Sequence, residues 1–421
     1  MKNNEIKKGA AYTFFSFLSS GINFILLLFI TKYIPPTGYG TLNMIAVLIA
    51  LFSVVSTFGC SGYQNVVYFR SDFNAYRRVV VGLLILGTIF LLIVNFIILL
   101  GHNFIFHVTE LEYKYQLIAV FISYSNMFLY IFQEYLRVKE KIRLYGIVSI
   151  LGVILNTLLT IHFVIFCNSG WIGRLYAQVL TAIVFFVVSI VVLCKIIDNP
   201  IKNIPSKKEM GEMLRWGIPL IPHQMSFWIR QSIDRIFLKM FYSFHIVGLF
   251  SFAYNLANII MIVGSAFNSI NSVTIYKKLA NDSDSMRREI VSLNLKVILL
   301  FFLLTIGIIM GTYVLIPIAF PKYVNSLPFI VPLCISAFFH NIYLLFVNIL
   351  FYFSKTKQIM RITISCSLIH VLLSFIFVRY SSLFLAYVML ITNMLTAAFI
   401  FYYSSKQYPL PWRKSIKIMK L

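Results

Sequence analysis

The sequence alternates between long apolar runs and short segments that carry most of its charged residues. A helix needs about 20 mostly apolar residues to cross the hydrocarbon core of a bilayer. Lipid offers the backbone no hydrogen-bonding partners, so membrane-spanning segments are helices or closed barrels, and runs of this length indicate helices. The pattern predicts an all-α polytopic membrane protein with about 12 transmembrane helices, at 10–31, 41–60, 79–100, 115–136, 145–167, 171–194, 216–238, 246–271, 292–319, 327–352, 362–378 and 382–404.

Basic residues are distributed unevenly among the segments that join these runs. The N-terminus, every second connection and the C-terminal tail together hold 27 Lys and Arg, whereas the intervening connections and their edges hold 6. Loops rich in Lys and Arg stay in the cytoplasm, so both termini are expected there. The alternation also indicates that residues 216–238 cross the membrane, because an interfacial helix at this place would put the later basic loops outside.

The overall composition supports a membrane protein. Hydrophobic residues make up 60% of the chain and charged residues 12%, about half of the charged fraction of soluble domains. In a soluble protein a net charge of +23 would indicate nucleic-acid binding, but here the basic residues are expected to face anionic lipid headgroups. The N-terminus is expected to form an uncleaved first span. The five cysteines have no metal-binding or redox spacing.

One predicted span, GIPLIPHQMSFWIRQSIDRIFL from Gly217 to Leu238, is unusually polar. A charged side chain in mid-membrane costs on the order of 3 kcal/mol, so such residues normally face a bundle interior or a watery cavity. Asp234 and Arg235 could instead snorkel at the outer end or form a fold-stabilising pair, whereas Arg230 lies deeper. Spacing of 100° per residue puts the polar and aromatic residues within an arc of about 160°: His223, Gln224, Phe227, Trp228, Arg230, Gln231, Asp234 and Arg235.

Other residues in the predicted spans could belong to the same site. Pro219 and Pro222 should kink or interrupt the helix, either at a gate or merely for packing. Asn255 and Asn258 share one face of the eighth span and could line the same cavity or bond across helices. Arg174, near the outer end of the sixth span, could reach headgroups or the mouth of the cavity.

An internal repeat is indicated by two weak echoes between the halves. GYGTLNMIAVLIALFSVVSTFGCSG, from Gly38, is similar to IVGLFSFAYNLANIIMIVGSAFNSI, from Ile246, and VKEKIRLYGI is similar to SKTKQIMRIT. Six spans in each half, both starting inside, would make a parallel repeat. The expected parts are a first six-helix lobe (1–194), a cytoplasmic linker (195–215), a second six-helix lobe (216–404) and a basic cytoplasmic tail (405–421).

With these features the chain resembles the Wzx-type polysaccharide flippases, in the superfamily that also holds MATE drug exporters and lipid II flippases. The resemblance covers the whole chain and rests on GYGTLNM, FGCSGYQNVVYFR and, above all, IDRIFL followed by VGLFSFAY. It implies two lobes around a central cavity that opens alternately to each side. It also implies a multi-pass protein of the bacterial inner membrane that moves undecaprenyl-pyrophosphate-linked oligosaccharide to the periplasmic leaflet, for O antigen or capsule.

The implied substrate assigns roles to the polar face. Arg230 and Arg235 could contact the diphosphate, and Phe227, Trp228 and Tyr254 could stack on sugar rings. No cofactor or metal is expected, although coupling to a proton or sodium gradient is considered. Membrane lipids, a polysaccharide polymerase and a chain-length regulator are the expected partners, and nucleic acid is not.

Two rival functions remain open from the sequence. A MATE-like cation-coupled drug exporter would normally carry acidic residues deep in the first half, where only Glu134, at a span end, comes close. A membrane polysaccharide polymerase would present a large outer loop, and no connection here exceeds about 22 residues. No clustered catalytic residues are evident, so the chain is not expected to be an enzyme.

Overall fold

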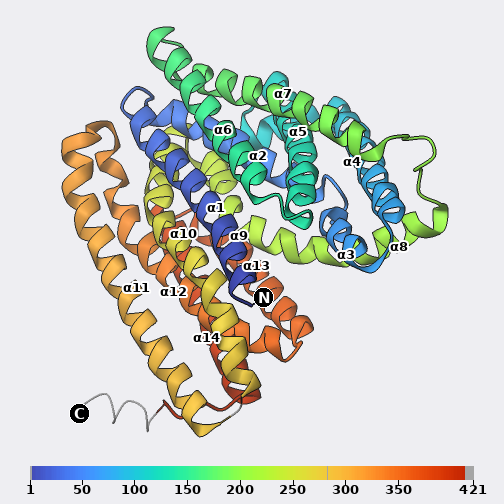
Figure 1. Cartoon of the computed structure of the whole chain (residues 1–421). Coiled ribbons are helices and arrows are strands. Elements are labelled where there is room, and N and C mark those ends of the chain that lie inside the picture. The colour runs from blue at the N-terminus through green and yellow to red at the C-terminus, as the bar shows by residue number, and fades with distance from the viewer. Residues whose placement is uncertain (1, 282, 413–421) are drawn as a thin grey trace. The chain divides into compact units, whose positions relative to one another are not determined.

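A computed structural model describes residues 2–281 and 283–412, and all regular structure in these ranges is helical (Figure 1). The last nine residues of the expected basic tail lie outside the described residues. The α-helices are α1 (Lys2–Thr31), α2 (Pro36–Val55), α3 (Tyr63–Arg70), α4 (Phe73–Thr109), α5 (Tyr113–Val138), α6 (Ile142–Ile161), α7 (Gly170–Ile197), α8 (Lys207–Gly217), α9 (Ile221–Phe241), α10 (Phe244–Ala280), α11 (Asp284–Ala319), α12 (Leu327–Tyr352), α13 (Thr356–Phe377) and α14 (Leu383–Gln407).

Ten of the described helical segments are long and apolar enough to cross a membrane, which confirms the predicted all-α polytopic class. They correspond to ten of the twelve predicted spans. The first predicted span contributes a shorter apolar stretch, Phe17–Thr31, within α1. The seventh forms the 21-residue helix α9, whose polar residues keep it out of the apolar set.

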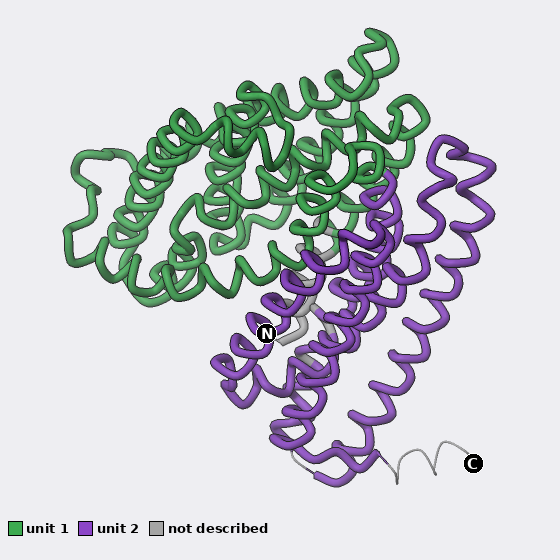
Figure 2. The backbone as a smooth tube through the Cα atoms, turned by 180° about the vertical axis from the view of Figure 1, so that it is seen from behind, with its two compact units in different colours: residues 1–248 green, residues 249–421 purple. Residues whose placement is uncertain are grey.

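By compactness the chain divides into a unit of residues 1–248 and a unit of residues 249–421 (Figure 2). This division places α8 and α9 with the first unit, whereas the sequence repeat would start the second half at 216. The boundary at 248 reflects which helices pack together, whereas the boundary at 216 reflects the similarity between the two halves of the sequence. The two boundaries need not coincide. The predicted lobe boundaries at 194 and 216 therefore stay predictions.

Each unit has its own apolar core. In the first unit, α5 packs on α2 and α7, α1 packs on α6, and α9 packs on α2 and α4. Met44, Phe90 and Val120 are buried where α2, α4 and α5 meet. In the second unit, α14 packs along α12 and α13, and α11 covers another side of α12. Phe346 and Ile400 are buried at its centre.

The first residues of α2 and α10 cross with their backbones in direct contact. A Cβ atom on Gly40 would overlap the carbonyl oxygen of Phe244, and one on Gly248 would overlap that of Pro36. Phe244 lies 208 positions after Pro36, and Gly248 lies 208 positions after Gly40. Each glycine therefore touches the counterpart of the residue that the other glycine touches, so the two contacts are reciprocal. Neither glycine could therefore carry a side chain without displacing backbone.

Two interruptions of the helices meet in the first unit. Gly59, at φ 75°, precedes the 3₁₀ turn Cys60–Gly62, and the 3₁₀ turn Ile218–Leu220 separates α8 from α9. A Cβ atom on Gly59 would overlap the carbonyl oxygen of Gly217, and Cys60 Sγ lies 3.2 Å from the carbonyl oxygen of Met213. Only glycine takes this backbone conformation readily at such close approach.

The start of α8 is fixed by a capping box that also binds α4. Ser206 Oγ accepts a hydrogen bond from the Glu209 backbone N–H at 3.3 Å, and Glu209 Oε2 accepts one from the Ser206 N–H at 2.8 Å. Arg78 Nε donates to Glu209 Oε1 at 2.7 Å. Partial burial acts to raise the pKa of the Glu209 carboxyl, but the hydrogen bonds from Ser206 and Arg78 outweigh it, and the pKa is lowered.

We expect the docking of α8 to weaken in acid. The lowered pKa means that the Glu209 carboxylate contributes its full stabilisation above its ordinary pKa near 4.5 and loses it as the pH falls through the folded-state value. The pair is a third exposed, so the loss should be no more than about 1 kcal/mol. Hydrogen exchange of α8 amides between pH 7 and pH 3, corrected for intrinsic rates, measures it. Glu209→Gln should remove most of this pH dependence and Glu212→Gln, at an exposed neighbour, should not; equal behaviour would contradict the assignment.

Candidate functional site

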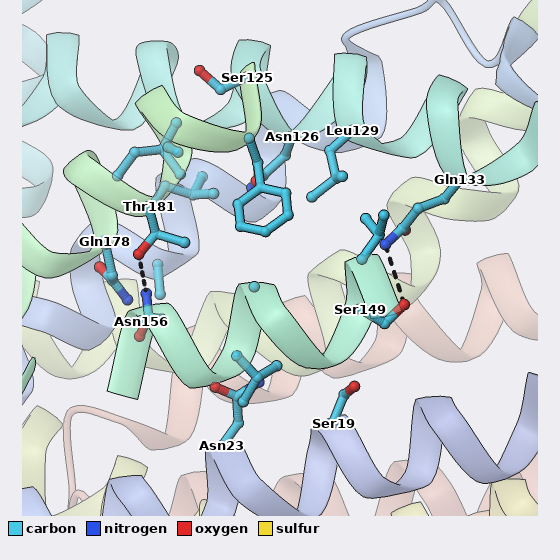
Figure 3. Close-up of a pocket in the computed structure, with 18 of the residues that line it drawn as sticks. Ser19, Asn23, Ser125, Asn126, Leu129, Gln133, Ser149, Asn156, Gln178 and Thr181 are labelled. Carbon is cyan, nitrogen blue, oxygen red and sulfur yellow. Dashed lines mark hydrogen bonds between the residues drawn. The ribbon is translucent and has the colours of Figure 1, made fainter. Parts of the chain in front are cut away.

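The first unit contains a partly open cavity of about 570 Å³ among α1, α2, α5, α6 and α7 (Figure 3). This volume lies within the range of small-molecule and sugar sites. Its walls belong to apolar spans, yet nearly half of the lining residues are polar and uncharged. These are Ser19, Asn23, Ser125, Asn126, Gln133, Ser149, Asn156, Gln178 and Thr181.

Helical spacing explains how single polar residues gather at one place. Residues seven apart lie on one face of a helix, two turns from each other. Asn126 and Gln133 are so spaced on α5, and Ser149 and Asn156 on α6. On α7 the lining residues fall at 174, 178, 181 and 185. Each helix therefore turns one polar stripe to the cavity and its apolar sides elsewhere.

A hydrogen-bond network spans α6 and α7 at one side of the cavity. Asn156 Oδ1 accepts a hydrogen bond from Arg174 Nη1, which also donates to Thr160 Oγ1 at 2.6 Å. Asn156 Nδ2 donates to Thr181 Oγ1 at 3.4 Å, a bond drawn in Figure 3. Arg174 is half-buried and lines this cavity, whereas its predicted place at the mouth of a cavity beside the α9 polar face stays a prediction. The guanidinium is therefore held in place by neutral partners.

Another pair of polar side chains joins α5 to α6. Gln133 Nε2 donates to Ser149 Oγ at 3.4 Å, and Figure 3 shows this pair set apart from the pair of Asn156 and Thr181. Aromatic surface is also present, because Tyr145 and Phe185 belong to the lining. Amides, hydroxyls and aromatic faces together are the groups that bind the hydroxyls and the apolar faces of sugar rings.

The charge of the lining is positive. Arg174 is the only charged residue among those lining this cavity in the described part of the chain. Glu134 follows the lining residue Gln133 in the sequence, but it is buried and does not line the cavity. It forms an ion pair with Arg137 at 2.9 Å and accepts a hydrogen bond from Asn65 Nδ2 at 2.7 Å. Such a lining suits a neutral or anionic ligand. No group of His, Cys, Asp and Glu in the described ranges is arranged to hold a metal ion.

The polar face of α9 is largely buried in the first unit. Asp234 is 1% exposed, and Arg230 and Arg235 are each 7% exposed. Arg230 lies over the ring of Phe227, 5.1 Å from its centroid, and Arg235 Nη1 donates to the carbonyl oxygen of Gln231. None of these residues lines the cavity described above. Their proposed contact with a diphosphate stays a prediction.

The remaining α9 residues differ in exposure. Trp228 Nε1 donates to the carbonyl oxygen of Val47 at 3.1 Å, which fixes the indole against α2. His223 is half-buried with its ring edge against Phe227, Gln224 is half-buried, and Gln231 is exposed. The sugar-stacking role of Trp228 remains a prediction, and its bond to α2 supports a packing role as well.

The two prolines lie at the break before α9. Pro219 belongs to the 3₁₀ turn Ile218–Leu220 and Pro222 to the first turn of α9, so the helix is interrupted as the sequence indicated. A role in gating stays a prediction. Asn255 and Asn258 are half-buried on α10 within the second unit, and their part in substrate binding is likewise a prediction.

Sequence comparison identifies the family of the chain. A family described as polysaccharide biosynthesis protein matches residues 6–276, well over half of the sequence. The chain belongs to this polysaccharide biosynthesis family. A protein of the Lsg locus of Haemophilus influenzae is 24% identical over 360 residues, which are 83% of this chain and 85% of that protein.

Solved structures show the fold of this polysaccharide biosynthesis protein. A MATE multidrug resistance transporter of the MOP superfamily, in an inward-facing conformation, matches with a TM-score of 0.74 at 15% identity, covering 95% of this chain and 96% of that one. A MOP superfamily transporter from Pyrococcus furiosus matches with a TM-score of 0.61 at 16% identity, covering 95% of each chain. The predicted architecture, about twelve spans in two lobes, is thereby confirmed, and the chain has a transporter fold.

Sequence reasoning missed most of the cavity lining of this polysaccharide biosynthesis protein. It found Arg174 but not Asn126, Gln133, Asn156 or Gln178, because one amide in an apolar span is unremarkable by itself. The available signal was that polar residues recur seven positions apart in three consecutive spans. It was overlooked because α9 concentrates its polar residues in one helix and is much easier to recognise.

Proposed function

We propose that the chain is a flippase that moves undecaprenyl-pyrophosphate-linked oligosaccharide from the cytoplasmic to the periplasmic leaflet by alternating access. The observation that carries this proposal is the cavity inside an apolar helical bundle, whose lining is polar, partly aromatic and, among the described residues, without Asp or Glu. Sugars and a diphosphate cannot cross about 30 Å of hydrocarbon unaided. Amide and hydroxyl groups offer a sugar replacements for the water that it leaves behind.

Membership of a polysaccharide biosynthesis family and a MOP transporter fold support the same proposal from independent directions. In it, the cavity of the first unit takes the glycan, and Arg230 and Arg235 on α9 take the diphosphate. We expect the cycle to use a proton or sodium gradient. The product would pass to a polymerase and its chain-length regulator, at the bacterial inner membrane.

A drug exporter is the second candidate, because MATE structures share the fold. A cationic drug would be held by acidic groups, and this cavity presents Arg174 instead. An enzyme is disfavoured by the transporter fold and by the family. The lining therefore favours a glycan over a cationic drug as the cargo, and the fold and the family favour a transporter over an enzyme.

The proposal predicts where lipid-linked glycan accumulates when the protein is absent. A strain deleted for the gene would be kept alive by a conditional block in an early glycosyl transfer step. After the block is released, single repeat units should accumulate in the cytoplasmic leaflet, inaccessible to an external glycosidase, and the surface polysaccharide ladder should disappear. Re-expression of the wild-type chain is the control. Units that accumulate outside would indicate a polymerase, and an unchanged ladder would contradict both functions.

A further inference from the structure

Arg174 lines the cavity and is held by hydrogen bonds from one guanidinium nitrogen. Both of its recorded hydrogen bonds leave from Nη1, to Asn156 Oδ1 and Thr160 Oγ1. In the described part of the chain, Nε and Nη2 form no hydrogen bond, and Arg174 lines the cavity. A guanidinium has five N–H donors in a planar fork, so an entire edge remains for a ligand.

The charge of Arg174 is also uncompensated by protein. No acidic side chain of the described residues forms an ion pair with it, and the lining of the cavity contains no Asp or Glu. Its hydrogen-bond partners Asn156 and Thr160 are both neutral. An arginine within a membrane span is costly unless it meets an anion or water, and no acidic side chain of the described residues meets this one.

We infer that the Nε–Nη2 edge of Arg174 is a subsite for a carboxylate carried by the glycan, so that the cargo contains an acidic sugar. This inference rests on the proposed function and adds the charge class of the substrate. An arginine fork matches a carboxylate with two parallel hydrogen bonds. Because the opposite nitrogen, Nη1, is anchored to α6, the fork is oriented before the ligand arrives, and less entropy is lost on binding.

The diphosphate of the carrier lipid is the other possible oxyanion at this subsite. A diphosphate carries at least two negative charges, whereas the cavity supplies one cation. A carboxylate balances that charge one to one. The neighbouring Gln178 and Thr181 are neutral hydrogen-bonding groups, suited to the hydroxyls of the same sugar ring rather than to further phosphate oxygens.

Ligand binding to the purified full-length protein tests this subsite without requiring transport. The probes are sodium glucuronate, glucose and inorganic pyrophosphate at constant ionic strength, each titrated while the thermal unfolding midpoint is recorded. Wild-type protein should half-saturate with glucuronate at a concentration about tenfold lower than with glucose, the effect of one charge-assisted bidentate contact.

Two variants probe the fork from opposite sides. Arg174→Lys keeps the charge and removes the fork. Asn156→Asp preserves side-chain size and supplies an internal carboxylate that neutralises Arg174. Each should raise the half-saturating glucuronate concentration about tenfold and change that of glucose less than about twofold. Arg379→Gln, at an exposed arginine of the second unit, is the matched control and should leave both unchanged.

Equal binding of glucuronate and glucose, or glucuronate binding that survives both variants, would overturn the subsite. Pyrophosphate binding that is tighter than glucuronate binding and is lost in both variants would assign the edge to the diphosphate instead, and would overturn the acidic sugar. Failure of the flippase proposal would appear separately, as an unchanged polysaccharide ladder in the deletion strain. If the deletion strain accumulates repeat units in the cytoplasmic leaflet but the protein binds glucuronate and glucose equally, only the subsite is contradicted.

Discussion

Gly40→Val is expected to remove nearly all folded protein from the membrane. Even the first carbon of a side chain at Gly40 would overlap the carbonyl oxygen of Phe244, and backbone cannot move aside as a side-chain tip can. Inserting atoms into a packed interior typically costs about 1–3 kcal/mol, and a backbone overlap at a helix crossing should exceed that range. Domains are stable by only about 5–15 kcal/mol in total.

The measurement is the monodisperse fraction of detergent-solubilised protein by fluorescence-detected size exclusion. Gly248→Val should be equally damaging, because its contact with Pro36 reciprocates that of Gly40 with Phe244. Gly101→Val in α4 is the matched control, since a Cβ there meets nothing within 4 Å. A Gly40→Val protein that elutes like the wild type would show that the α2–α10 crossing is looser than the structure indicates.

Arg230→Ala is expected to reduce flipping about tenfold or more while the protein still inserts, since one charge-assisted contact to a diphosphate is lost. Arg230 is 7% exposed, lies over Phe227 and is one helical turn before the buried Asp234. Its removal should also lower stability, because the buried Arg230 side chain would leave a cavity. The assay therefore has to be normalised to the amount of folded protein.

Transport by this variant is read from the leaflet distribution of lipid-linked units and from the surface ladder, each per folded molecule. Arg215→Ala removes an exposed arginine from the adjacent helix α8 and should transport normally. A normal rate per folded molecule for Arg230→Ala would assign the polar face of α9 to structure alone. In that case the glycan cavity of the first unit would remain as the substrate site.

The fold could be predicted from the sequence because lipid imposes a strong constraint on length and polarity. Runs of about 20 apolar residues gave ten of the spans directly. Loop charges predicted which side of the membrane each connection faces. The prediction that α9 is a span needed the argument from basic loops, since its polar residues weaken any hydropathy signal. The packing of α8 and α9 with the first unit could not be foreseen, because sequence symmetry contains no information about which side chains interlock.

The candidate site was predictable only in part. Arg174 could be noticed because a lone charge in a span is expensive. Asn156, Gln133 and Gln178 could not be separated from residues that bond across helices, since the tilt and rotation of each span decide what a single amide faces. The cluster on α9 was prominent in the sequence, yet burial alone does not distinguish a binding group from a structural one.

The contact between Gly59 and Gly217 has a mechanical consequence. Gly59 lies in the turn before the 3₁₀ turn Cys60–Gly62, Gly217 is the last residue of α8, and their backbones leave no room for a side chain on either glycine. A shift of one turn would therefore clash with the other unless both moved together. Lengthening one of these turns by a residue would consequently misalign both, and a compensating insertion in the other turn should restore the alignment.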